Sequence, residues 1–363
     1  MDNHTVGIYE RGAATYAERR KAYHPARAEA LAASVPDGTW RLDLGSGPGH
    51  YLPHLGRPVV AADPAVAMVA EAVDRHGGPG VAGVVGDVES LPFRRGAFGG
   101  VWASKCLQHV AATRLPLALA ELHRVLPVDG RLDVTLFRGE GEDVSGPDDE
   151  FPGRLFTWWE PDALSRLLVG AGFEVTAVDA PADPPSAESH DRFAVSARRE
   201  RSLADTVGPG MRLLMCGLNP SLYSADTGVG FARPGNRFWP AARAAGVVSV
   251  DRDPRGALAR DGVGMTDVVK RATVAAAELD AGEYRDGLAR VGHLVSWLQP
   301  GAVCFVGLAG WRAAVDRKAR PGVQPEGLGG RPVYVMPSTS GLNAGSSLAD
   351  LTDHLRQAAA LAP

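Results

Sequence analysis

The chain has 363 residues, too many for one ordinary domain, and its 45% hydrophobic content is typical of globular domains with apolar cores. The formal net charge of −4 conceals an asymmetry. Residues 1–200 carry 20 basic and 28 acidic side chains, whereas residues 201–363 carry 18 and 14. The basic second half favours a polyanionic partner such as nucleic acid, although metabolic domains also reach a charge of +4.

The three cysteines lie in apolar surroundings without a Cys-x-x-Cys pair, which argues against a disulfide scaffold, an iron–sulfur cluster and a zinc site. No run reaches the roughly 18 apolar residues of a membrane span, and the first residues form no apolar signal region. We therefore expect a cytoplasmic protein without membrane contact and without a bound metal.

The first half alternates short apolar strands with helices. We expect strands at residues 41–44, 59–62, 99–104, 131–137, 174–179 and 192–197, and helices at 65–75, 114–126 and 161–171. This alternation predicts a parallel sheet with covered faces, closed by an antiparallel pair of the last two strands. The acidic segment 139–153 is expected to be a surface loop or lid, or else a solvated insertion without a role.

The polar segment 198–210 ends in Gly-Pro-Gly and is predicted to be a linker. A second alternation follows it. We expect strands at residues 212–216, 302–306 and 333–336, and helices at 237–245, 283–298, 310–316 and 348–359. The pattern predicts another α/β unit, smaller than the first.

A glycine turn follows the first expected strand, in the sequence L-D-L-G-S-G-P-G at residues 42–49. The glycines allow close approach of a ligand to the backbone, and their spacing departs from the G-x-G-x-x-G of dinucleotide sites. Asp63 ends the next strand, where a carboxylate can accept both hydroxyls of a ribose. Asp87 follows the strand after that, where it can meet an adenine amino group.

This half resembles class I S-adenosylmethionine-dependent methyltransferases over most of residues 8–197. Supporting stretches are L-P-F at 91–93 and R-V-L-P-V-D-G at 124–130, and residues 9–20 look like the helix that caps the methyl donor. The resemblance implies a Rossmann-like sheet, catalysis mainly by positioning the reactants, and S-adenosylmethionine as cofactor. Its cofactor-binding residues would be Asp43, Gly45, Gly47, Gly49, Asp63 and Asp87.

The sequence does not identify the methyl acceptor. The fourth strand is followed by W-A-S-K-C at 102–106, which matches neither the Asp/Asn-Pro-Pro-aromatic motif of base-amine methyltransferases nor the Pro-Cys of cytosine-carbon enzymes. His109 has two interpretations, a general base or a helix-start residue near the cofactor.

The second half carries residues suited to removing a base from DNA. Asn219 follows an expected strand at the carboxyl edge of a parallel sheet, and its amide can orient a water molecule but accepts a proton poorly. Phe231 offers a ring for stacking an extruded base. Leu342, beside the flexible Gly341, is an apolar tip that can wedge into the gap left by a flipped base. These motifs contain no carboxylate at the reacting bond.

These residues resemble the mismatch-specific uracil/thymine-DNA glycosylase branch of the uracil-DNA glycosylase superfamily, over about residues 211–360. The matching stretches are G-L-N-P-S at 217–221, G-x-x-F-A-x-P-x-N-R-F-W at 228–239, G-x-T-x-x-V-x-R-x-T at 264–273 and M-P-S-T-S-G-L at 336–342. The resemblance implies that Asn219 is catalytic and places the attacking water. It assigns base binding to Gly217, Leu218, Phe231 and Ser338, and the DNA wedge to Gly341, Leu342 and Asn343.

Two departures from the family pattern matter. Ser221 replaces a glycine and can narrow the pocket or add a hydrogen bond, and the last motif has no histidine to assist the departing base. Uracil and electron-poor or etheno-type bases should therefore leave more readily than thymine. No lysine nucleophile is evident near the turn, so we expect hydrolysis without strand cleavage and without a cofactor.

We therefore expect an α/β fold with two domains. A Rossmann-like class I methyltransferase sheet spans residues 1–197, and a three-layer α/β/α uracil-DNA-glycosylase-like domain spans 211–363. The predicted activities are methyl transfer from S-adenosylmethionine to an unidentified acceptor and hydrolysis of the N-glycosidic bond of uracil or a damaged pyrimidine in double-stranded DNA with a G·U-type mismatch. Two alternatives are a non-cleaving DNA- or base-binding module that targets the methyltransferase, and a metabolite methyltransferase fused to an independent repair enzyme.

Overall fold

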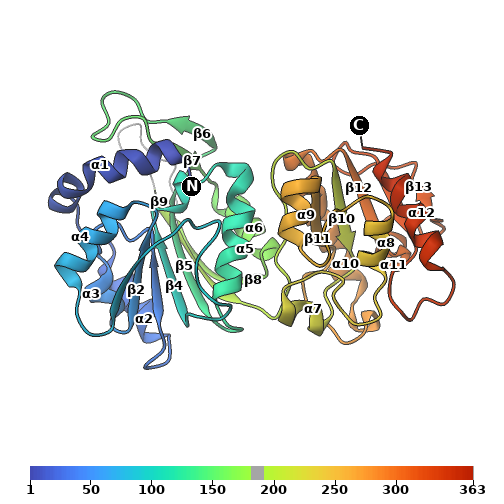
Figure 1. Ribbon diagram of the computed structural model, residues 1–363, viewed down its shortest axis with the longest axis horizontal. Helices are drawn as coiled ribbons and strands as arrows, with labels where there is room; N and C mark the ends of the chain where they lie inside the picture. Colours follow the sequence, from blue (N-terminus) through green and yellow to red (C-terminus); the bar gives the residue numbers. More distant parts are fainter. Residues whose placement is uncertain (181–191, 363) are drawn as a thin grey trace. The chain divides into compact units, whose positions relative to one another are not determined.

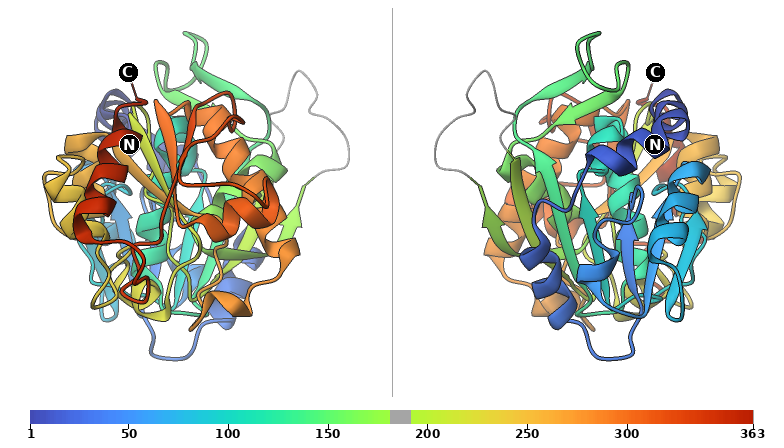
Figure 2. Two further views of the ribbon diagram at one scale, coloured as in Figure 1. Left: turned by 90° about the vertical axis from the view of Figure 1, so that its right-hand side faces the viewer. Right: turned by 90° about the vertical axis from the view of Figure 1, so that its left-hand side faces the viewer.

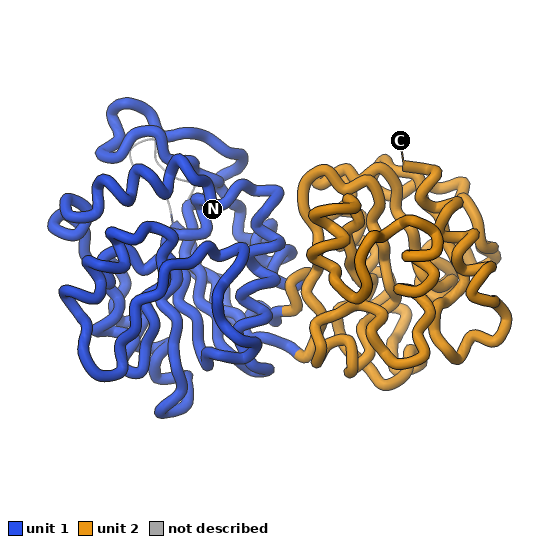
Figure 3. The backbone as a smooth tube through the Cα atoms, in the orientation of Figure 1, with its two compact units in different colours: residues 1–169, 173–200 blue, residues 170–172, 201–363 orange. Residues whose placement is uncertain are grey.

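The computed structural model describes residues 1–180 and 192–362. The chain divides into two compact units, which Figure 3 colours separately. Unit 1 comprises Met1–Val169 and Phe173–Glu200, and unit 2 comprises Gly170–Gly172 and Arg201–Pro363. Each unit is built on its own sheet.

Unit 1 contains a seven-stranded sheet of order β3-β2-β1-β4-β5-β9-β8 (Figure 1). The first five strands in this order run parallel, whereas β9 is antiparallel to both of its neighbours. The strands are β1 (Arg41–Leu44), β2 (Val59–Asp63), β3 (Val81–Val85), β4 (Gly100–Ser104), β5 (Arg131–Phe137), β8 (Phe173–Asp179) and β9 (Arg192–Arg199). The predicted parallel sheet with an antiparallel pair at one edge is confirmed.

Helices surround this sheet, and their bounds are α1 (Asn3–Arg19), α2 (Pro25–Ala33), α3 (Leu52–Leu55), α4 (Val66–His76), α5 (Leu115–Val125) and α6 (Pro161–Gly170). The Asp2 carboxylate caps α1 by accepting a hydrogen bond from the Thr5 N–H at 2.7 Å. Strands β1, β2 and β4 are buried nearly throughout, because helices cover both faces of the sheet.

Segment 139–153 is not a plain surface loop. Strand β6 (Gly141–Val144) lies within it and pairs antiparallel with β7 (Leu155–Trp158), which follows it, to form a separate two-stranded sheet. Figures 1 and 2 show this hairpin at the same end of unit 1 as α1. The strand residues 141–144 are all exposed. Because the segment is acidic and has no buried face, its composition did not predict a strand.

Unit 2 contains a five-stranded sheet of order β11-β10-β12-β14-β13, parallel except for β13. The strands are β10 (Leu213–Gly217), β11 (Val263–Asp267), β12 (Ala302–Val306), β13 (Gly322–Val323) and β14 (Val333–Met336). The helices are α7 (Leu222–Thr227), α8 (Phe238–Ala244), α9 (Pro254–Asp261), α10 (Ala281–Leu298), α11 (Leu308–Ala314) and α12 (Leu348–Ala359).

The alternating side chains of β10 show why unit 2 has three layers. Leu213 and Met215 belong to a core with residues of α8 and α12. Leu214 and Cys216 belong to a second core with residues of α10 and α11. The sheet is therefore covered on both faces, as the sequence predicted.

The segment expected to be a linker is not a free tether in the structure. Arg198 and Arg199 end β9, and the main stretch of unit 2 begins at Arg201. Ser202 and Asp205 are buried within unit 2. The Ser202 hydroxyl donates to the carbonyl oxygen of Lys270 after β11, and the Asp205 carboxylate accepts from Thr266 in β11. Across residues 1–180 and 192–362, no helix combines the length and apolar character needed to span a membrane.

Candidate functional site

The glycine turn after β1 has a backbone that only glycine tolerates. Gly45, Gly47 and Gly49 have φ angles of +61°, +50° and +81°. A Cβ atom on Gly45 would lie 2.2 Å from the Cβ of Cys106, and one on Gly49 would lie 2.8 Å from a Leu52 methyl group. The turn therefore brings the backbone close to its surroundings, as a ligand-binding turn requires.

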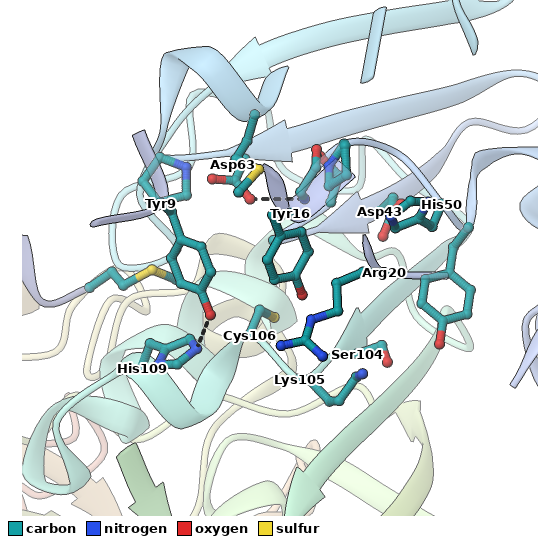
Figure 4. A pocket seen from close by; sticks show the side chains of 18 of the residues that line it. Tyr9, Tyr16, Arg20, Asp43, His50, Asp63, Ser104, Lys105, Cys106 and His109 are labelled. Carbon is teal, nitrogen blue, oxygen red and sulfur yellow. Dashed lines mark hydrogen bonds between the residues drawn. The ribbon is translucent and has the colours of Figure 1, made fainter. Parts of the chain in front are cut away.

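Asp63 joins this turn at the end of β2. Its Oδ2 accepts a hydrogen bond from the Gly47 N–H at 3.0 Å (Figure 4), and its Oδ1 accepts one from the Ala65 N–H at 2.9 Å. Burial raises the pKa of Asp63 to about 6, although both N–H groups favour the charged form. The carboxylate is thus fixed against the turn and lines the same pocket.

Asp43 is the second acidic group in this pocket, which we call the donor pocket. Gly45 and Gly47 of the glycine turn line it together with Asp63, Tyr9 and Tyr16, whereas Gly49 is not among its described lining residues. The Asp43 side chain is buried, and its Oδ2 has no hydrogen-bond partner among the described residues. Burial raises its pKa well above the ordinary value. A cationic or N–H-bearing ligand group would satisfy this oxygen.

Asp87 does not line the donor pocket in the part of the chain that the structure describes. Its Oδ2 lies 2.7 Å from the nitrogen of Met1, and its Oδ1 accepts a hydrogen bond from the Glu89 N–H at 2.9 Å. The structure therefore brings together the glycine turn, Asp43 and Asp63, but leaves Asp87 engaged elsewhere.

His109 is held in a fixed state beside the donor pocket. Its Nδ1 lies 2.6 Å from the Leu155 carbonyl oxygen, and its Nε2 lies 2.9 Å from the Tyr9 hydroxyl (Figure 4). Because the carbonyl can only accept, Nδ1 carries the proton and Nε2 accepts from Tyr9. Burial lowers the pKa of His109 to about 4. This geometry is poorly suited to a general base, because Nε2 already accepts a hydrogen bond from Tyr9.

Lys105 is a pocket residue that the sequence reasoning passed over. It follows β4 with a φ of +56°, and its Nζ lies 4.1 Å from the centre of the Tyr23 ring. Burial and the nearby Arg192 and Arg20 guanidinium groups lower its pKa to about 8. W-A-S-K-C at 102–106 matches no nucleotide-methylation motif, and a single lysine after a strand carries no signal of its own in the sequence.

Unit 2 has a pocket of about 200 Å³ at the carboxyl edge of its sheet, which we call the excision pocket. Four of the expected site residues line it: Leu218, Asn219, Phe231 and Ser338. Gly341, Leu342 and Asn343 lie in the neighbouring loop 338–346, which we call the wedge loop. The sequence-predicted residues therefore gather in two adjacent places.

The amide group of Asn219 has a defined orientation. Its Nδ2 donates to the carbonyl oxygen of Arg271 at 3.0 Å and to the hydroxyl of Thr273 at 2.8 Å. Within residues 192–362, its Oδ1 has no hydrogen-bond donor. The free oxygen can therefore accept a hydrogen bond from a water molecule.

Asp267 brings a carboxylate into the excision pocket, which corrects the expectation of a site without one. It ends β11 beside Gly217, and a Cβ atom on Gly217 would lie 2.2 Å from its Oδ1 and 3.3 Å from the Phe231 ring. Burial raises the pKa of Asp267 to about 6, and the nearby Lys270 opposes this shift. The residue was missed because the sequence reading did not identify β11.

The Phe231 ring has a defined position at the excision pocket. Its φ of +56° is unusual for a residue with a side chain, and its ring stacks on Phe238 with centroids 4.2 Å apart and an interplanar angle of 23°.

Ser221 caps α7, because its Oγ accepts a hydrogen bond from the Ser224 N–H at 3.1 Å. The serine that departs from the family pattern therefore adds a hydrogen bond.

The wedge loop exposes the apolar side chain of Leu342, and hydrogen bonds hold the backbone of the loop. Leu342 is 86% exposed. The Asn343 Nδ2 donates to the Ser338 carbonyl oxygen at 2.7 Å, and Arg237 donates to the carbonyl oxygens of Ser340 and Asn343 at 3.1 and 2.6 Å. Arg237 therefore supports the backbone of the wedge loop.

The fold and the two pockets define a chain of two α/β units, each with a pocket at the carboxyl edge of its sheet. Residues 42–134 match the family model of the methyltransferase domain, and residues 204–360 match that of the uracil DNA glycosylase superfamily. Unit 1 therefore carries a methyltransferase domain, and unit 2 carries a domain of the uracil DNA glycosylase superfamily.

Several solved structures are similar to the first half. The 1,6-didemethyltoxoflavin-N1-methyltransferase of Burkholderia thailandensis is 23% identical, with 54% of this chain and 85% of that chain covered and a TM-score of 0.42. An S-adenosylmethionine-dependent methyltransferase of Methanosarcina mazei is 16% identical, with 50% and 99% covered and a TM-score of 0.42. One from Mesorhizobium loti is 20% identical, with 47% and 98% covered and a TM-score of 0.38.

Proposed function

We propose that unit 2 hydrolyses the N-glycosidic bond of uracil or a damaged pyrimidine in double-stranded DNA, with the G·U mismatch as its preferred context. The observation that carries this proposal is the gathering of Asn219, Asp267 and Phe231 in one pocket beside the exposed Leu342. Phe231 stacks the flipped base while Leu342 fills the gap in the duplex. Unit 2 is also the basic half of the sequence, which favours binding to DNA.

In this proposal Asn219 Oδ1 holds the attacking water by a hydrogen bond. The water oxygen forms the bond to the sugar carbon, and the carbon–nitrogen bond breaks with its electron pair leaving on the base. The water proton passes to the Asp267 carboxylate, which is largely ionised at neutral pH because its pKa is about 6. Leaving-group quality still orders the bases, since no histidine of the described residues lines the excision pocket.

The test uses the full-length protein and labelled duplex DNA with a single G·U pair, followed by alkali to break abasic sites. Cleavage should appear only after alkali and should fall by about 100-fold or more in Asn219→Ala, in line with the loss of a water-positioning group. Asn3→Ala, which changes an exposed asparagine in unit 1, serves as the matched control. Unchanged excision in Asn219→Ala would refute its role, and DNA binding without excision by the wild type would support the targeting-module alternative.

We also propose that unit 1 uses S-adenosylmethionine, with Asp43, Asp63 and the glycine turn as its binding residues. The observation that supports the fit is the buried, unpartnered Oδ2 of Asp43 beside a turn that admits no Cβ at Gly45. When bound, this cofactor supplies an electrophilic methyl group. The chain's own residues hold and orient the reactants, and Tyr9 and His109 form part of the wall between α1 and the sheet.

Calorimetric titration with S-adenosylhomocysteine tests this second proposal. Binding should be lost or weakened by more than tenfold in Asp63→Ala, while Asp162→Ala on α6 should leave it unchanged. Absence of binding by the wild-type protein would refute the cofactor assignment.

We further propose a cytoplasmic location, where DNA and the methyl donor are both present.

A further inference from the structure

The donor pocket adjoins a larger cavity of about 700 Å³, which we call the outer cavity. It is bounded by α1, by Lys105 and Gln108 after β4, by Phe137 of β5, by the β6–β7 hairpin and by Arg192 of β9. Tyr9, Tyr16, Arg20, Tyr23 and Lys105 line both spaces. The volume is that of a site for a small molecule.

Aromatic rings form much of the wall of the outer cavity. They are contributed by α1 and the segment after it, by β5 and by β7: Tyr9, Tyr16, Tyr23, Phe137, Phe156 and Trp158. The Phe156 and Trp158 rings stack with centroids 5.9 Å apart, and the Tyr9 and Tyr16 rings meet edge to face at 5.6 Å. Rings from several elements offer faces and edges to a flat, apolar ligand.

The cations of the cavity fall into two groups. Arg154 is committed to Asp149 at 2.7 and 3.0 Å, and Arg20 is committed to Glu150. Lys105 and Arg192, by contrast, form no ion pair with a carboxylate in the described parts of the chain, and their cationic groups lie over the Tyr23 ring at 4.1 and 5.1 Å. Partly buried cations without counterions favour an anionic ligand.

A third feature is the Gln108 side chain, which is 97% buried in the wall of the cavity. Its Oε1 has no hydrogen-bond partner among residues 1–180 and 192–362. A buried carbonyl oxygen of this kind is stabilised by a donor. It therefore fits a ligand that also carries a hydroxyl or N–H group.

We propose that the outer cavity binds a planar aromatic acid, with its ring against the aromatic wall, its anionic group at Lys105 and Arg192, and a hydroxyl or N–H donor at Gln108. This inference rests on the proposed methyl transfer, for which such a molecule is the acceptor. In that reaction an oxygen or nitrogen lone pair of the aromatic molecule forms the bond to the methyl carbon. The bond between that carbon and the sulfur of the methyl donor would break with its electron pair left on sulfur. A proton on the acceptor atom would pass to water.

Nucleic acid is the rival acceptor because it also combines rings with negative charge. Residues 1–200 carry 28 acidic and 20 basic side chains, and five of the acidic ones lie between residues 142 and 150 on the hairpin. A duplex would have to place many phosphates over this acidic surface, whereas a small monoanion needs only Lys105 and Arg192. The charge distribution therefore favours a small molecule.

The test is calorimetric titration of the full-length protein, with and without saturating S-adenosylhomocysteine. The probes are salicylate, 4-hydroxybenzoate and 1-hydroxy-2-naphthoate, each compared with its neutral carboxamide. At least one acid should bind tenfold or more tightly than its amide. Arg192→Gln should reduce acid binding by about tenfold without changing amide binding. Arg198→Gln, on the same strand and paired at the surface with Glu174, should change neither.

Lys105→Met is a second variant and should also reduce the preference for the acid, so the test does not depend on one folded mutant. Equal affinity for acid and amide, or no binding of any acid, would overturn the inference. Displacement of the acid by a DNA duplex in an Arg192-dependent manner would overturn it in favour of nucleic acid. Acid binding with the expected preference but no S-adenosylhomocysteine binding would instead refute the methyltransferase proposal and leave the cavity assignment standing.

Discussion

Replacing Gly217 by alanine would place a methyl group between the main groups of the excision pocket. The added Cβ would lie 2.2 Å from Asp267 Oδ1, whereas ordinary contacts begin at 3.4 Å. The carboxylate, the strand or both must therefore shift by about 1.2 Å. A misplacement of about 1 Å can cost about 100-fold in rate, and overpacking of this kind costs about 1–3 kcal/mol of stability.

Single-turnover excision from a G·U duplex, read after alkali, measures the first effect, and thermal unfolding of the full-length protein measures the second. Gly292→Ala is the matched control, because a Cβ on this residue of α10 meets only an ordinary contact at 3.4 Å. In Gly217→Ala/Asp267→Ala, much of the stability lost in the single glycine variant should return. Excision by Gly217→Ala within a factor of about three of wild type would refute the steric reasoning.

Four further outcomes follow from the same contacts. Asp267→Asn should slow excision by about 100-fold, and the wild-type rate should fall as the pH decreases through about 6, a limb that pH–rate profiles should not show for the variant. Gly45→Ala should weaken S-adenosylhomocysteine binding by about tenfold or more in calorimetry, because its Cβ would overlap Cys106 and its φ is +61°. Asp205→Asn should lower the unfolding free energy of unit 2 by about 3–5 kcal/mol in denaturant titrations, because it leaves two cations buried. Aromatic-acid binding in calorimetry should weaken as the pH rises through about 8, where Lys105 loses its proton while the arginines stay charged.

The elements with strong apolar patterns were predictable from the sequence. Strands β12 and β14 and helix α12 have the bounds that their hydrophobic periodicity indicated. Strand β11, with the sequence V-G-M-T-D, was not identified, because glycine, threonine and aspartate interrupt its apolar pattern even though all five of its residues are buried. The strand gains its stability from pairing with β10, which is a tertiary interaction that no local pattern reports.

The same limit explains the outcome at the sites. Asn219 and Phe231 lie in recognisable motifs and do line one pocket. Asp267 lines the same pocket because β11 pairs with β10, and this pairing is a property of the fold that the local sequence does not indicate. Asp87 follows its strand as expected, yet its carboxylate bonds to the Met1 nitrogen and the Glu89 N–H and does not line the donor pocket. Motifs thus indicated which residue types were present, and the side-chain partners that decide their roles came from the fold.

Arg237 has a consequence for how the wedge loop meets DNA. One guanidinium group, fixed at the start of α8, bonds the carbonyl oxygens of Ser340, Asn343 and Ser346, so the loop's shape is set before any duplex arrives. Ordering a free loop of this length at the moment of binding would cost conformational entropy residue by residue. In the proposed reaction the exposed Leu342 can therefore contact one base pair after another without a change in the loop. The binding energy of each contact is then available to open the base pair that is least stable.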